Sequence, residues 1–221
     1  MILCLVTDRR RLGGALGLPE SAWVEALHHQ VEAACRAGVD YIQVREPDIE
    51  AGPLVDLVKS LMAVVSGASR ILVNDRLDVA LAASAHGVHL KEHSILPAEV
   101  RRLTPPGFLV GCSIHNISSI AARKSADFLI AGTVLPTASK PAVDYLDQDG
   151  LSKVVEAADG QPVLGIGGLN LSAMPMLAST RASGLAAIGA FIPAAGDDVS
   201  DFVQNHVSAM RKAFDSARWR T

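Results

Sequence analysis

The sequence predicts one α/β domain, a closed (β/α)8 TIM barrel that spans residues 1–221. Short β-branched runs alternate with segments of helical periodicity about eight times, and the length suits one barrel of about 250 residues better than two domains. A composition of 49% hydrophobic but only 4% aromatic residues favours parallel strands buried beneath helices. The alternative is a doubly wound open sheet, which usually has a G-x-G-x-x-G turn after its first strand. The stretch VTDRRRLGG does not match that turn.

The strands are predicted from short apolar runs that end in a turn residue or a polar residue. ILCLVT is the first such run, and YIQVR, RILVN and GVHL follow at the spacing that helical crossovers require. In chain order the predicted strands are 2–7, 41–45, 70–74, 87–90, 108–112, 127–132, 162–166 and 185–189.

The helices are predicted where apolar residues recur three or four positions apart between these runs. The first and last are long and amphipathic, and the apolar segment 78–85 follows the third strand. The stretch 136–150 is the longest irregular one, and we expect it to form a loop over the active face. The predicted helices are 20–37, 50–65, 97–103, 116–124, 151–158, 171–179 and 199–217.

Charge and cysteine usage restrict the partners and the compartment. A net charge of −3 gives no electrostatic basis for a nucleic-acid surface. Cys4, Cys35 and Cys112 are far apart and lie among apolar residues, which indicates buried thiols in a reducing cytoplasm. MILCLVTDRR is too short for a signal peptide or a membrane span, so we expect a cytoplasmic protein that binds no membrane. The apolar surface of the final helices would suit a symmetric homodimer.

Polar residues collect where the predicted strands end. In a barrel of this type the carboxyl ends of the strands form the active face. Because side chains alternate along a strand, Gln43 and Arg45 share one face, as do Ser113 and His115. The residues expected at this face are Gln43, Arg45, Asn74, Asp75, His89, Ser113 and His115, with Thr137 and Lys140 in the loop after the sixth strand.

Two features of this set have both a structural and a functional interpretation. Arg45 is costly inside a barrel unless a charge meets it, which is either a ligand or an ion pair with Glu46 or Asp75. GIGGLN, with Gly168, and AIGA, with Gly189, follow the last two strands. Glycines there let backbone N–H groups approach a phosphate, although a Gly-Gly pair also suits a plain tight turn.

In their order along the chain, these motifs resemble one family. LVTD, QVRE, VNDR, GVHL, GCSIH, AGTVLPTASK, GIGG and IGA are similar to the thiamine phosphate synthase and TenI family of barrels. The resemblance extends from Leu5 to about Ala190. It implies a site for a phosphorylated thiazole and, in the synthase branch, a pyrimidine diphosphate that loses pyrophosphate with the help of Mg²⁺.

The resemblance also implies roles for individual residues. Gln43, Arg45 and Asn74 would face the pyrimidine diphosphate, and Asp75 would bind Mg²⁺. Ser113 and Lys140 would contact pyrophosphate, with Thr137 beside Lys140 in the same loop. Gly168 and Gly189 would lie by the thiazole phosphate.

Two departures from the synthase pattern favour the other branch. Pro47 stands where the synthase pattern has a lysine, and Ser94 stands where it has a second metal carboxylate. Ionising a diphosphate needs positive charge on the leaving group, so these changes weaken the synthase hypothesis unless Lys91 or Glu92 compensates. The TenI branch resembles the synthase in shape and acts as a thiazole tautomerase without a metal.

The favoured hypothesis is therefore a TenI-like thiazole tautomerase with no cofactor, in which His115 of CSIHN moves a proton. The bland alternative for His115 is a residue hydrogen-bonded to loop backbone. Two other functions stay open: a Mg²⁺-dependent thiamine-phosphate synthase, and a non-catalytic sensor of a phosphorylated ligand.

Overall fold

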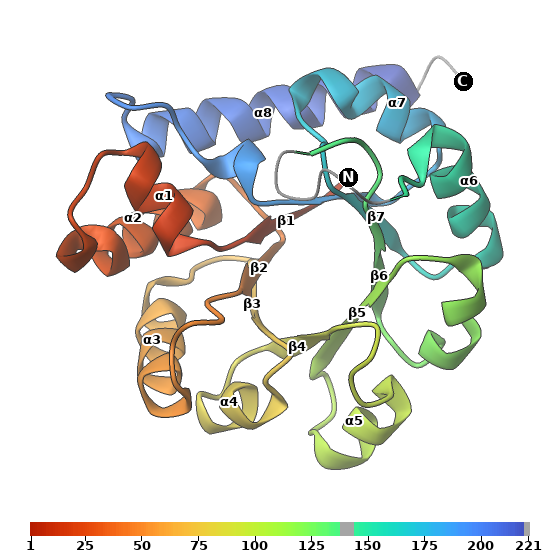
Figure 1. Cartoon of the computed structure of the whole chain (residues 1–221), viewed down its shortest axis with the longest axis horizontal. Coiled ribbons are helices and arrows are strands. Elements are labelled where there is room, and N and C mark those ends of the chain that lie inside the picture. The colour runs from red at the N-terminus through yellow and green to blue at the C-terminus, as the bar shows by residue number, and fades with distance from the viewer. Residues whose placement is uncertain (138–143, 219–221) are drawn as a thin grey trace.

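The computed structural model, which describes residues 1–137 and 144–218, is a closed barrel of parallel strands surrounded by helices (Figure 1). Each strand pairs with its sequence neighbours, and β8 pairs with β1 to close the ring. The strands are β1 (Ile2–Val6), β2 (Tyr41–Val44), β3 (Arg70–Asn74), β4 (Gly87–Leu90), β5 (Leu109–Ile114), β6 (Phe128–Gly132), β7 (Val163–Ile166) and β8 (Gly184–Ala187). The predicted barrel is confirmed; its extent as one domain over residues 1–221 stays a prediction.

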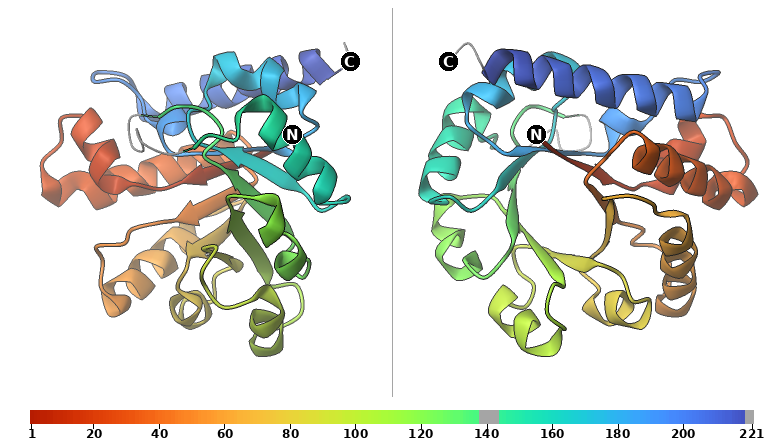
Figure 2. Two further views of the ribbon diagram at one scale, coloured as in Figure 1. Left: turned by 45° about the vertical axis from the view of Figure 1, so that its right-hand side comes forward. Right: turned by 180° about the vertical axis from the view of Figure 1, so that it is seen from behind.

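The helices cover the outside of the barrel. Figure 2 shows α8 lying across the flank, where it packs on both α7 and α2. The helices are α1 (Arg9–Ala15), α2 (Trp23–Arg36), α3 (Ala51–Val64), α4 (Leu77–Ala82), α5 (Pro97–Leu103), α6 (Asp147–Ala157), α7 (Met174–Ser179) and α8 (Val199–Arg218). Of the helices in the described part of the chain, none combines the length and the apolar composition that crossing a bilayer requires.

One expected helix is replaced by shorter turns, and one observed helix was not expected. The predicted helix 116–124 is two short 3₁₀ turns, η2 (Ile117–Ser119) and η3 (Ala121–Arg123). The side chain of Asn116 accepts hydrogen bonds from Ser118 and Ser119, and Ser119 also donates to Glu92, so side-chain bonds compete with a helical ladder. Helix α1 was not expected, because its residues RRRLGGA show no helical apolar period.

The strands alternate between two apolar regions. One face of each strand packs against the helices, and the other fills the barrel interior. Tyr41 stacks on Phe128 inside the barrel, with ring centroids 4.8 Å apart. The buried interior residues are Cys4, Val6, Leu72, Phe128, Ile130, Leu164 and Ala186. This plug closes the lower part of the barrel, so polar groups further along the strands lie above it, at the mouth.

Cysteine burial and surface apolarity test two further expectations. Cys4, Cys35 and Cys112 are free and buried, as predicted, and burial raises the pKa of Cys4 and of Cys112 to about 12.

The apolar face expected on the final helices is not found among the described residues, because α8 buries its large apolar residues against the barrel. The exposed large apolar side chains of the described residues are Val24, Leu81, Ile95, Leu96, Leu103 and Ile117. The homodimer stays a prediction without that basis.

Candidate active site at the barrel mouth

Gln43 and Asn74 lie side by side above the interior plug. β2 and β3 run parallel in a register that places Gln43 opposite Leu72 and Asn74 two residues further on. The buried amide of Gln43 donates from Nε2 to Oδ1 of Asn74 over 2.8 Å. Each amide keeps further donors and acceptors, so the pair can form hydrogen bonds to a polar ligand at the mouth.

His89 and Ser113 form a second pair, on β4 and β5. Nε2 of His89 lies 2.9 Å from Oγ of Ser113, and the imidazole is buried against Phe128. Burial lowers the pKa of His89 to about 4, so the ring is neutral at pH 7. Its buried Nδ1 has no partner among the described residues. An unpaired lone pair costs less than an unpaired N–H, which favours Nε2–H donating to Ser113 and leaves the Ser113 proton for a ligand.

Asp75 lies directly after β3 with a left-handed backbone, at φ 59°. Its amide donates to the carbonyl of His89 over 2.8 Å, which fixes it against β4. Nζ of Lys91 lies 2.8 Å from Oδ2, and the hydroxyl of Ser94 donates to Oδ1. Burial raises the pKa of Asp75, but hydrogen bonds from Lys91 and Ser94 outweigh it and leave this pKa below its usual value. Asp75 is therefore a carboxylate neutralised by the chain's own lysine.

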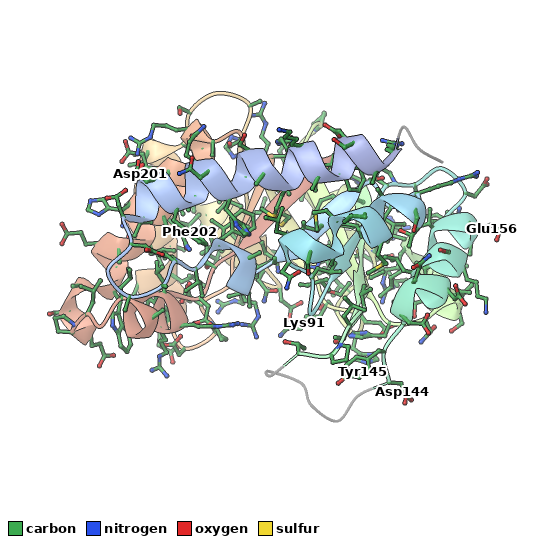
Figure 3. The ribbon with its side chains drawn as sticks, turned by 90° about the horizontal axis from the view of Figure 1, so that it is seen from above. Lys91, Asp144, Tyr145, Glu156, Asp201 and Phe202 are labelled. Atoms are coloured by element: carbon green, nitrogen blue, oxygen red, sulfur yellow. The ribbon has the colours of Figure 1, made fainter. Side chains whose placement is uncertain are left out.

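Lys91 and Arg45 bring positive charge to the mouth. Lys91 directly follows β4, is 63% exposed, and points toward the same side of the molecule as Tyr145 (Figure 3). Arg45 directly follows β2 and is half-buried. Both ion pairs considered for Arg45 are absent among the described residues, since Glu46 binds Arg9 and Asp75 binds Lys91. The half-buried guanidinium is thus available to an anionic ligand.

His115 lies on the rim beyond β5, paired with Glu92. Its Nδ1 is 2.6 Å from Oε2 of Glu92, and its backbone N–H donates to Oε1 over 3.3 Å. The imidazole is 51% exposed, whereas Glu92 is 12% exposed. Burial raises the pKa of Glu92, but hydrogen bonds from Ser119 and His115 leave it below its usual value. A carboxylate that orients an imidazole in this way is an arrangement suited to proton transfer.

The turns after β7 and β8 differ in whether their backbone conformation and packing require glycine. Gly167 and Gly168 have φ of 97° and 68°, and a Cβ on Gly168 would lie 2.6 Å from the carbonyl oxygen of Pro136. This packing alone explains the pair as a tight turn. Gly189 has no such constraint: the atoms nearest to a Cβ built there belong to the guanidinium of Arg11.

Some expected site residues lie at or beyond the limit of the described chain. Thr137 is half-buried at the end of the described part of the loop after β6. Lys140 lies outside the described residues. Three contacts between distant segments were not expected from the sequence: the His89–Ser113 pair, the His115–Glu92 pair, and Arg11 beside Gly189. The alternation of residues along β4 and β5 was the only available signal for the first of them.

The synthase hypothesis requires a magnesium ion, so the side chains at the mouth must include oxygen ligands that can bind it. Among residues 1–137 and 144–218, no group of three or more histidine, cysteine or acidic side chains could hold a metal. Asp75 is one carboxylate, and Glu92 is engaged by His115 and Ser119. Mg²⁺ is commonly held by one or two carboxylates plus substrate phosphates and water. Asp75 therefore fits Mg²⁺ as its one carboxylate ligand, with the remaining ligands coming from a bound phosphate group and water.

A separate concavity of about 440 Å³ lies away from the mouth, where α8 begins. Its acidic lining includes Asp201, and His206 stacks on Phe202 with ring centroids 5.2 Å apart. Figure 3 shows Asp201 and Phe202 on α8, apart from Lys91. No residue at the end of a strand lines it, so it is not part of the candidate site.

Comparisons with known proteins agree with the fold and the motif order. Residues 17–191 match the family described as thiamine monophosphate synthase. The chain is 35% identical to a putative thiamine-phosphate synthase of Geobacter sulfurreducens, over 86% of each chain. It is 33% identical to the thiamine-phosphate synthase of Roseiflexus castenholzii, over 95% of this chain and 89% of that one. A solved structure, thiamine phosphate pyrophosphorylase from Pyrococcus furiosus, superposes with a TM-score of 0.76 at 28% identity, covering 98% and 96%.

Proposed function

Because the chain belongs to the thiamine monophosphate synthase family, we propose that it joins hydroxymethylpyrimidine diphosphate to thiazole phosphate and releases pyrophosphate. The similar proteins have synthase names, which supports this hypothesis over the tautomerase that the sequence analysis favoured. The observation that best supports the synthase is the position of Lys91, whose Nζ lies 2.8 Å from Oδ2 of Asp75. This lysine brings to the mouth the positive charge that the synthase pattern has at position 47, where this chain has proline.

The reaction needs charge stabilisation more than proton transfer. The bond between the pyrimidine methylene carbon and the diphosphate oxygen breaks, and its electron pair leaves with pyrophosphate. The thiazole nitrogen then donates its lone pair to the methylene carbon, so no proton is gained or lost. Arg45 and Lys91 stabilise the leaving diphosphate, and the Ser113 hydroxyl donates to it. Gln43 and Asn74 orient the pyrimidine.

Mg²⁺, held by Asp75 and the diphosphate, would supply further neutralisation of the leaving group. With that ion bound, the Lys91 ammonium, which pairs with Asp75 in the structure, would be available to the diphosphate. The side chain of Asp75 is 24% exposed and is therefore accessible to either cation. A cytoplasmic location, expected from the buried free thiols, is part of this proposal.

The test is to mix pyrimidine diphosphate with thiazole phosphate and to measure pyrophosphate release over a range of Mg²⁺ concentrations. We expect Mg²⁺-dependent release and a fall in kcat of at least about tenfold for Lys91→Gln. Lys59→Gln, which changes an exposed lysine on α3, is the matched control and should retain full activity. Absence of product at every Mg²⁺ concentration would reject the synthase.

The thiazole tautomerase is the second candidate, and the His115–Glu92 pair favours it. In that reaction His115 would remove a proton from the thiazole carboxylate phosphate and return one elsewhere on the ring. We expect His115→Asn to lower aromatisation about 10²–10⁴-fold while ligand binding persists. Unchanged aromatisation in His115→Asn would remove this residue from the mechanism, and synthase activity should be insensitive to the same change.

The third candidate, a non-catalytic sensor, predicts binding of thiazole phosphate with neither reaction. The names of the similar proteins are those of enzymes, which favours a catalyst. Running both assays on one preparation separates all three functions.

A further inference from the structure

Three consecutive arginines open α1, and two of them are neutralised within the chain. Arg9 binds Glu46 at 2.9 Å and Asp48 at 2.6 Å. Nε of Arg10 lies 3.1 Å from Asp48. Arg11 differs: its backbone N–H caps the helix by donating to Asp8, but its exposed guanidinium has no hydrogen bond or ion pair within the described residues. The start of α1 therefore presents one uncompensated positive charge.

That charge lies at the mouth of the barrel. α1 follows β1, and β1 pairs with β8, so the start of α1 is next to the turn that leaves β8 (Figure 1). An ideal Cβ on Gly189 would lie 3.0 Å from Nη2 of Arg11 and 3.7 Å from Nη1. The guanidinium thus lies against Gly189, and a side chain at that position would have to displace it. Gly189 is exposed, so both groups face solvent at the rim.

The two anionic groups of the proposed substrates need separate cations. Arg45 and Lys91 follow β2 and β4, and the proposed mechanism uses both for the diphosphate. The glycine turns follow β7 and β8, which pair with each other, and no lysine or arginine lies within either turn, 167–170 or 188–191. Within these two turns, a phosphate dianion would meet no cationic side chain. A planar guanidinium beside them can bind two phosphate oxygens at once.

We propose that Arg11 binds the phosphate of the thiazole substrate, together with the backbone of Gly189, and so selects phosphorylated over unphosphorylated thiazole. This inference rests on the proposed function only for the identity of the ligand. The absence of a side chain at Gly189 lets the guanidinium reach the β8 turn, while the ion pairs of Arg9 hold α1 in place.

The test measures binding rather than turnover, by calorimetry on the full chain with thiazole phosphate and with the unphosphorylated thiazole alcohol. We expect Arg11→Gln to raise the Kd for thiazole phosphate at least about tenfold, the loss of one charged hydrogen-bonding partner, and to leave the alcohol unchanged. Arg11→Lys should recover part of the loss. Arg10→Gln, one residue away on the same helix, is the matched control and should change the Kd less than about twofold.

Three outcomes would overturn the inference: equal Kd values for Arg11→Gln and wild type, equal losses for phosphate and alcohol, or a wild type without preference for the phosphate. Because Arg11 is exposed and unpaired, the variant should fold, and an unchanged Tm checks this. A chain that lacks synthase activity but loses phosphate-dependent binding in Arg11→Gln would retain this inference and reject the proposed function.

Discussion

At the scale of single residues, His89 contacts both the barrel interior and the candidate site, because its ring packs against Phe128 and its Nε2 bonds to Ser113. Its ring lies where an apolar residue would pack equally well, against Phe128 and above the interior plug. A Cβ on Gly111 would lie 2.7 Å from its Nδ1, so β5 has no side chain at the position that the ring occupies. The chain thus keeps a neutral imidazole in place to orient Ser113.

This burial should appear in the pH dependence of stability. The pKa of His89 is about 4 in the folded protein, below the ordinary value of 6.5. Between these pH values the unfolded chain binds a proton that the folded chain does not, so stability falls as the pH falls from 6.5 to 4. In His89→Asn we expect the fall across this window to be smaller by about 3 kcal/mol, measured by urea unfolding at a series of pH values.

The comparison uses the slope with pH and not the stability at one pH, because His89→Asn also removes packing. The lowered pKa values of His86 and His206 contribute the same slope to both proteins and cancel. Parallel curves for the two proteins would show that His89 is not kept neutral by burial.

Residues at strand ends were predictable from the sequence, but their partners were not. Asn74 ends β3 and Asp75 follows it, while Gln43 and Ser113 are the next-to-last residues of β2 and β5, and strand alternation directs the strand residues to the mouth. For Arg45 the sequence left open either a ligand or an ion pair with Glu46 or Asp75. Both carboxylates are taken by other cations, and this depends on how close the strands bring those cations.

At the scale of elements, a buried carboxylate fastens α1 to the end of β2. Glu46 is 4% exposed and accepts from the hydroxyl of Thr7 over 2.7 Å, from the backbone N–H of Arg9, and from the Arg9 guanidinium. Burial raises the pKa of Glu46, and these hydrogen bonds only partly offset that rise. The helix that the sequence analysis did not predict is therefore stabilised by a tertiary network and not by an apolar period.

We expect Glu46→Ala to lower the free energy of unfolding by roughly 3 kcal/mol, because it leaves the Thr7 hydroxyl and the Arg9 amide unpaired beside a partly buried cation. Asp48→Ala removes the more exposed partner of Arg9 and should cost less than about 1 kcal/mol. Chemical denaturation of both variants at pH 7 measures the difference. Equal losses would mean that the network adds nothing beyond a surface ion pair.

Elements could be predicted from the sequence where the local pattern decides them, but not where contacts with distant residues do. Strands 70–74 and 87–90 and helix 97–103 were predicted with their observed limits, because local pattern and tertiary packing agree there. Residues 116–124 have helical spacing of Ile117 and Ile120, yet Ser119 and Arg123 bond to Glu92 across the rim and the segment breaks into 3₁₀ turns. Contacts made at the active face override the local pattern.

At the scale of the whole molecule, closure of the ring depends on β8 meeting β1. Gly184 pairs with Ile2 in the parallel register, and a Cβ on Gly184 would lie 1.8 Å from the carbonyl oxygen of Ile2. That neighbour is backbone and cannot rotate away, so a methyl group there would push the two strands apart. Because Gly189 follows β8 and Arg11 lies in the helix after β1, pairing of these two strands brings together the two groups proposed to bind phosphate.

Gly184→Ala should therefore lower the free energy of unfolding by roughly 3 kcal/mol or more, as overpacking against backbone does, and weaken binding of thiazole phosphate in the protein that still folds. Gly52→Ala is the matched control: Gly52 lies in α3 with no atom within 4 Å of a built Cβ, and alanine should stabilise the helix by about 0.5–1 kcal/mol. Urea unfolding and calorimetry on the two variants measure both effects. A Gly184→Ala protein as stable as Gly52→Ala would show that the ring tolerates separation of β1 and β8. The positions of Arg11 and Gly189 would then not depend on close pairing of these two strands.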